Sequence, residues 1–84
     1  LSKALGVALH DDDYRACIAF LRGERTRRHV TQQQLARLLD KPQSFVSKFE
    51  RGDRRLDVAE FVRVANALEI PLREALKSLG WRAD

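Results

Sequence analysis

The chain has 84 residues, a net charge of +4, 44% hydrophobic residues and a single cysteine. This length allows one small domain with a thin core, because so short a chain buries only a little over half of its surface on folding. The one cysteine excludes an internal disulfide, and no Cys/His cluster has metal-ligand spacing. We therefore expect a cytoplasmic protein without a metal or other cofactor.

Two compositional features indicate the fold class and the kind of partner. Leu, Ile, Val and Phe are plentiful, Gly and Pro are few, and no stretch alternates convincingly between apolar and polar residues, which predicts an all-α fold. Residues 14–55 carry eleven basic and four acidic residues, so the positive charge is concentrated there. This asymmetry indicates a polyanionic partner, although an Arg-rich solvated surface explains the charge alone equally well.

The first thirteen residues are predicted to be an N-terminal arm or short extra helix, followed by the domain at 14–84. Residues 1–9 are apolar and small, too short to cross a membrane, and suited to a frayed arm or a dimer contact. His10 and three aspartates then supply a cap and a negative first turn. Neighbouring carboxylates on a helix point apart, which disfavours a metal site. With neither an initiator Met nor a signal peptide, we expect a fragment or a processed chain.

The next segment has the spacing of an amphipathic helix. Tyr14, Cys17, Ile18 and Leu21 recur one turn apart, so Cys17 is expected in the core rather than as a nucleophile. Arginines follow at the end of this helix and in its exit loop, where cations complement the helix dipole. His29 is expected to adopt a left-handed backbone and has no predicted catalytic role.

A second helix has a full start signal. Thr31 and Gln34 form a capping box, and Val30 and Leu35 occupy the positions of a hydrophobic staple. Its buried side is predicted to be Leu35, Ala36, Leu38 and Leu39.

A third helix is predicted to begin at Pro42, where the missing N–H costs nothing. Val46 and Phe49 face inward, and Phe45 either reaches a thymine methyl group or caps the edge of the core. The outer face is polar, includes long side chains and has no acidic residue. It consists of Gln43, Ser44, Ser47, Lys48 and Arg51.

Two more helices complete the predicted bundle of five. Asp57 and Glu60 form a second capping box, stapled by Leu56 and Phe61, and the apolar stripe continues through Val64, Ala65 and Leu68. Pro71 opens the last helix, with Leu72, Ala75, Leu76 and Leu79 inward and Gly80 as its stop. Trp81 is either a lid on the core or an interface anchor.

The helices predicted around residues 31–52 are joined by a tight turn, and the second displays hydrogen-bonding side chains. This is the geometry that fits the major groove of DNA. The residues Thr31-Gln32, Leu35-Ala36, Gln43-Ser44, Val46-Ser47 and Phe49-Glu50-Arg51-Gly52 resemble the lambda-repressor/Cro-type (XRE) helix-turn-helix family. The resemblance runs from about Tyr14 to Leu79 and implies a five-helix DNA-binding bundle. Asp40 stands where the family usually has Gly, so its backbone is expected to be left-handed at some cost in strain.

The resemblance implies several residue roles. It aligns Arg25 and Glu50 with a recurrent ion pair, places Gln32 against a phosphate and places Gln43, Ser44, Ser47 and Lys48 against base edges. This agrees with the chemistry, since Gln pairs with adenine and Lys donates to guanine. Phosphate contacts are further expected from Arg27, Lys41, Arg54 and Arg55.

These features predict a transcription regulator of prokaryotic or phage type, acting as a repressor at the nucleoid. We expect a homodimer on a palindromic operator in double-stranded DNA, read by the recognition helix 43–51. A protein-interaction module such as an antitoxin, with a protein partner, is the alternative. An enzyme is disfavoured because neither His has a defined carboxylate partner and no phosphate-binding glycine loop is present.

Overall fold

The computed structural model describes residues 11–82. Residues 1–10 of the predicted arm at 1–13 lie outside this range, and residues 11–13 form the start of the first helix. The described chain is all-α, as predicted, with no strand in this range. Its helices are α2 (Asp11–Arg27), α3 (Gln32–Leu38), α4 (Gln43–Arg51), α5 (Val58–Ala67) and α6 (Leu72–Ser78).

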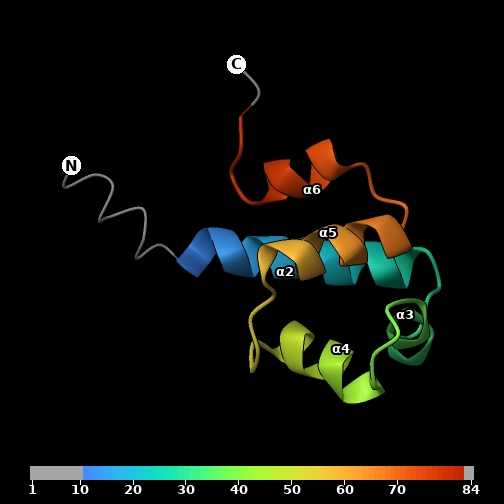
Figure 1. Ribbon diagram of the computed structural model, residues 1–84. Helices are drawn as coiled ribbons and strands as arrows, with labels where there is room; N and C mark the ends of the chain where they lie inside the picture. Colours follow the sequence, from blue (N-terminus) through green and yellow to red (C-terminus); the bar gives the residue numbers. More distant parts are fainter. Residues whose placement is uncertain (1–10, 83–84) are drawn as a thin grey trace.

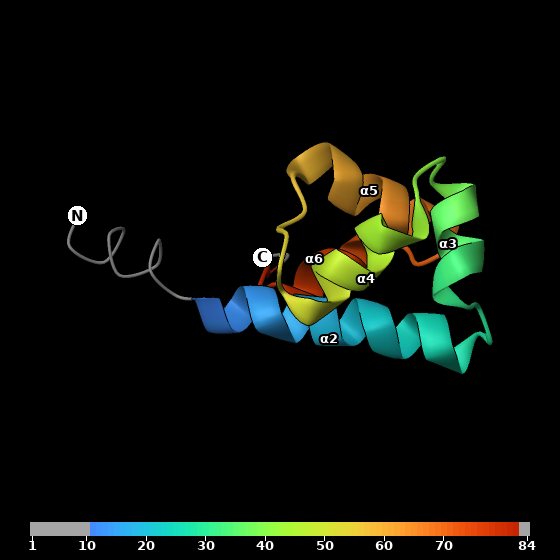
Figure 2. The ribbon, with the colours of Figure 1, turned by 90° about the horizontal axis from the view of Figure 1, so that it is seen from below.

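The helices are arranged so that α4 lies at one side of the bundle. In Figure 1, α2 and α5 occupy the middle, α6 lies above them, and α3 and α4 lie below. Seen from below in Figure 2, α4 is nearest the viewer and α3 crosses its end steeply. One face of α4 is thereby presented away from the bundle, while its other face packs on the core.

A single hydrophobic core joins the five helices. Cys17 and Leu21 from α2, Leu35 from α3 and Phe49 from α4 are each no more than 1% exposed. The apolar spacing of α2 and α5 is confirmed, since the remaining predicted stripe residues are buried or packed against this core. Burial also raises the pKa of the Cys17 thiol, although a hydrogen bond with Ser78 opposes it, which makes this thiol a poor nucleophile.

The predicted helix starts are confirmed for α3 and α5. Thr31 Oγ1 accepts from the Gln34 N–H at 3.0 Å, and Gln34 Oε1 accepts from the Thr31 N–H at 2.8 Å. The box at Asp57 forms in the same way. The two proline positions were predicted one residue early: Pro42 and Pro71 are N-caps rather than first helical residues. Their extended ψ angles of 156° and 133° place them just before the helix proper.

Three helices end on a non-glycine residue with a left-handed backbone. His29 and Asp40 have φ of 59° and 57°, as predicted, and Glu69, which we did not predict, has φ of 57°. In each case the backbone N–H of the residue that follows donates a hydrogen bond to the carbonyl five residues before it. For Asp40 this bond runs from the Lys41 N–H to the Ala36 carbonyl, at 2.9 Å. This is the Schellman arrangement, whose hydrogen bonds offset the strain of an L-residue at positive φ.

Two leucines predicted to face inward are exposed. Leu38 is 62% exposed because, on a helix of about 3.6 residues per turn, it lies at the edge of the face that Leu35, Ala36 and Leu39 share. Leu72 is 42% exposed because it is the first residue of α6 and its side chain points back beyond the packed part of the helix.

Trp81 is neither fully buried nor free of contacts. The Arg73 guanidinium lies 5.7 Å from the centre of its ring, and the residue is 41% exposed. The indole therefore lies against Arg73 of α6 and is partly open to solvent.

Candidate nucleic-acid interface

The outer face of α4 carries the polar side chains that the sequence placed there. Gln43, Ser44 and Lys48 are exposed, and Ser47 is half-buried with its hydroxyl donating to the Ser44 carbonyl at 3.2 Å. Val46 and Phe49 on the opposite face have no exposed surface, so they fix the rotation of the helix. The face is thus held outward by packing rather than by contacts among its own side chains.

Phe45 belongs to the core edge rather than to the outer face. It is 8% exposed, and its ring meets Phe49 edge-on with 5.6 Å between centroids. The Arg54 guanidinium lies 4.8 Å and the Lys41 ammonium 5.6 Å from the ring centre. Of the two roles left open by the sequence, this environment supports the capping of the core.

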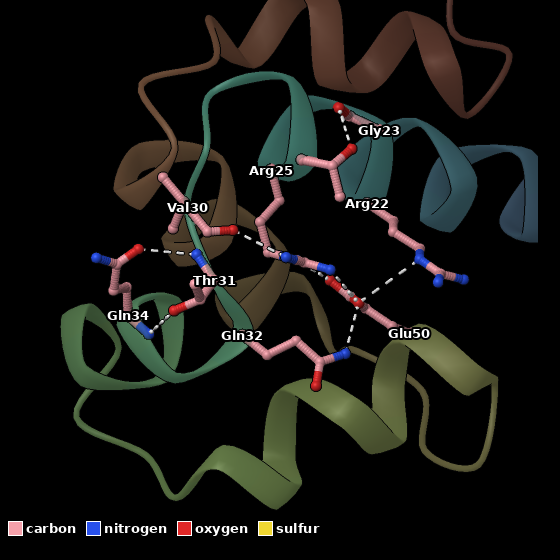
Figure 3. A network of polar contacts seen from close by, with 9 residues as sticks. Arg22, Gly23, Arg25, Val30, Thr31, Gln32, Gln34 and Glu50 are labelled. Carbon is pink, nitrogen blue, oxygen red and sulfur yellow. Dashed lines mark hydrogen bonds and ion pairs between the residues drawn. The ribbon is translucent and has the colours of Figure 1, made fainter.

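Behind the α4 face lies a polar network that we call the Glu50 cluster, made of Arg22, Arg25, Gln32 and Glu50 (Figure 3). Glu50 Oε2 accepts from Arg25 Nε at 2.7 Å, and Oε1 accepts from Arg25 Nη2 at 3.0 Å. This is the ion pair expected from the sequence. Because the Glu50 side chain is only 3% exposed, the paired guanidinium is needed to compensate its burial.

The remaining contacts of this cluster join three helices. Gln32 Nε2 donates to Glu50 Oε1 at 2.9 Å, which ties the start of α3 to the end of α4. Arg25 Nη1 also donates to the Val30 carbonyl at 2.8 Å, which fixes the loop between α2 and α3. The cluster therefore sets how the two helices of the motif stand relative to α2 (Figure 3).

Arg22 is the residue of this region whose role the sequence analysis missed. Its Nε lies 4.0 Å from Glu50 Oε1, and its side chain is 64% exposed. It lines an open groove of about 570 Å³ between α2 and the end of α4, together with Arg51 and Gly52. Its position one turn before Arg25 was the available signal, since residues three apart share a helix face.

Arg27 does not lie beside the recognition helix. It forms an ion pair with Glu24 at 2.6 Å. Because a helix has about 3.6 residues per turn, a residue two positions after Arg25 lies on roughly the opposite side of α2. Arg27 therefore lies on a different side of α2 from Arg25, and its guanidinium is paired within that helix.

Lys41, Arg54 and Arg55 flank α4 at its two ends. Lys41 is exposed in the turn before α4, and the Arg55 guanidinium lies 4.4 Å from the centre of the Tyr14 ring. Arg54 donates to both carboxylate oxygens of Glu60, at 2.8 and 2.9 Å. Arg54 is therefore a structural link between the loop and α5, with its charge largely balanced by Glu60.

Hydrogen bonds from Arg54, and then from the Asp57 N–H, lower the pKa of Glu60 from 4.5 to about 2. A pKa that is lower in the folded state stabilises the fold above about pH 4.5, and this stabilisation is lost as the pH falls towards 2. We expect Glu60→Gln to be less stable than the unchanged chain at pH 7 and to lose most of this difference near pH 2. Urea unfolding across this pH range measures it.

A second variant checks the cause of this pH dependence. Arg54→Gln removes the main partner of Glu60, so it should flatten the dependence of stability on pH over the same range. A stability difference between Glu60→Gln and the unchanged chain that is equal at pH 7 and near pH 2 contradicts the assignment.

Residues 11–82 carry neither a metal cluster nor a membrane-spanning helix. No group of three or more His, Cys, Asp or Glu residues there is arranged to hold a metal ion. In the same part of the chain, no helix has the length and apolar character needed to cross a bilayer.

Comparison with known proteins places this geometry in a family. A family model described as helix-turn-helix matches residues 21–81. No curated protein matches the sequence at a significant level. The matched range covers α3 to α6 and the part of α2 that carries Arg22 and Arg25. The chain therefore belongs to the lambda-repressor/Cro-type (XRE) helix-turn-helix family of DNA-binding transcription regulators.

Proposed function

We propose that the protein is a repressor of prokaryotic or phage type that occupies a palindromic operator as a homodimer. The observation that carries this proposal is the acid-free outer face of α4, which the buried side of the helix and the Glu50 cluster hold away from the bundle. Such a face fits the major groove, where side chains read base edges. Repression then requires only that the homodimer occupies the operator, and no chemical reaction is involved.

Base reading is assigned to the exposed side chains of α4. Gln43 can pair with both the N6 and N7 atoms of adenine, and Lys48 can donate to guanine. Ser44 and Ser47 lie between them and accept or donate according to the base that they meet. Together the four residues supply the sequence information.

Phosphate binding is assigned to groups around that face. The sequence predicted phosphate contacts from Gln32, Lys41 and Arg55, and we keep these three in the proposal. We replace Arg27 by Arg22, because Arg22 lies beside the end of α4. Gln32 gives one amide proton to Glu50, which leaves the second for a phosphate oxygen. Arg54 supports the loop through Glu60 rather than binding a phosphate.

The dimer is tested by selecting sites from a random duplex library and titrating the chain against the best site. One recognition helix reads only a few base pairs, so we expect palindromic sites whose half-sites are about one helical turn apart, with two chains per duplex. A duplex carrying a single half-site is the control and should bind far more weakly. Non-palindromic sites bound by one chain contradict the dimer.

The salt dependence of DNA binding distinguishes this function from the alternative, a module that binds only proteins. A mobility-shift titration over a salt series should show affinity for DNA falling steeply, because phosphate contacts release counterions. An absence of DNA binding at low salt contradicts the proposed function.

A further inference from the structure

The most exposed apolar side chain of the helix-turn-helix unit lies away from the recognition face. Leu38, at the end of α3, is 62% exposed and borders two open hollows of about 450 and 330 Å³. The first hollow lies towards the loop after α2, and the second lies towards the end of α5. We call this region the Leu38 surface, and its defining residues are His29, Val30, Arg37, Leu38, Arg63 and Ala67.

The charged side chains that line these two hollows are of one sign. The side chains that line the two hollows include Arg37, Arg63 and His29 but no acid. Within residues 11–82, neither Arg37 nor Arg63 has a side-chain hydrogen bond or an ion pair. Glu60, one turn before Arg63, is already engaged by Arg54. An acidic partner would therefore meet cations whose charges are not yet balanced.

The position of the Leu38 surface separates it from the DNA-binding face. The C-terminal ends of α3 and α5 lie together at one side of the bundle, whereas the outer face of α4 points down in Figure 1 and towards the viewer in Figure 2. Phosphates are bound by cations and hydrogen-bond donors, and an exposed leucine adds nothing to such a contact. A protein segment can use both the apolar floor and the charged rim.

We propose that the Leu38 surface binds an acidic amphipathic segment of a partner protein. An apolar side chain of that segment packs against Leu38 between the two hollows, and flanking Asp or Glu side chains pair with Arg37 and Arg63. Binding at this side leaves α4 open, so the partner and DNA are held at the same time. This inference is independent of whether the protein represses.

The experiment selects short random peptides on the full chain and measures the affinity of the selected peptides by fluorescence anisotropy. We expect Asp and Glu around a central Leu, Ile or Phe. Leu38→Ser, and separately Arg37→Glu combined with Arg63→Glu, should weaken binding by at least about tenfold, the loss typical of a central contact. Val58→Ser is the matched control, because Val58 is 81% exposed on another part of the bundle; it should leave the affinity within about twofold.

Circular dichroism melts verify that each variant is folded, and a mobility shift measures its DNA binding. Unchanged DNA affinity of Leu38→Ser supports the proposal. The proposal is overturned if no peptide is selected, if the selected peptides lack acidic residues, or if Leu38→Ser leaves their affinity unchanged. It is equally overturned if Leu38→Ser impairs DNA binding, or if sedimentation shows that the substitution dissociates a dimer formed through this surface.

Discussion

Replacing Glu50 by alanine is expected to lower the free energy of unfolding by on the order of 3 kcal/mol. The substitution leaves the Arg25 guanidinium, in a residue only 8% exposed, without its carboxylate partner, and it also removes the acceptor of the Gln32 amide. The cost of a buried charge without a partner exceeds that of a lost surface pair. Urea unfolding at neutral pH measures the difference.

The matched control is Asp53→Ala, three residues further along the chain. Asp53 pairs with Arg51 at 3.0 Å, but the two side chains are 60% and 62% exposed, so this substitution should change stability by less than about 0.5 kcal/mol. If Glu50→Ala costs no more than Asp53→Ala, the Glu50 cluster does not hold the motif together. DNA affinity should fall with Glu50→Ala even at temperatures where the variant is folded, because the cluster orients Gln32.

Substitutions on and beside α4 should separate sequence reading from general affinity. Gln43→Ala or Lys48→Ala should cost about 1–3 kcal/mol on the best site and blunt the discrimination between bases. Lys48→Ala should also reduce binding to random DNA somewhat, because it removes a charge. Affinity for selected and random duplexes, measured by mobility shift, distinguishes the two effects.

Arg55→Ala provides the contrasting result. It removes a cation from the loop after α4, so it should weaken all sequences to a similar degree and flatten the salt slope by about one unit. The control is Arg73→Ala, which removes a cation from α6 on the far side of the bundle and should leave both quantities unchanged (Figure 1). If Gln43→Ala preserves the ranking of sites while Arg55→Ala rearranges it, the recognition face has been misassigned.

The sequence by itself determined the features that depend on neighbours along the chain. The capping boxes at Thr31 and Asp57 form between residues three apart, and the inward stripes of α2 and α5 follow from helical spacing. The family resemblance, together with the need of a Glu on a basic helix end for a partner, also led to the Arg25–Glu50 pair. The capping boxes and stripes are predictable because their geometry is fixed once a helix forms, whereas the Arg25–Glu50 pair joins two helices and was inferred from the resemblance and the charge pattern.

Only the tertiary structure decided which side chains have their charge or apolar surface left open. Arg54 is paired with Glu60, whereas Arg22 lies at the exposed edge of the Glu50 cluster, 4.0 Å from Glu50 and with its side chain 64% exposed. Local spacing predicts pairs within one helix, such as Arg27 with Glu24. Pairs between different elements depend on distances that local spacing does not contain. The exposure of Leu38 arose in the same way: it lies at the edge of the apolar face of α3, and the packing of α3 against α4 and α5 determined how far the core extends over that face.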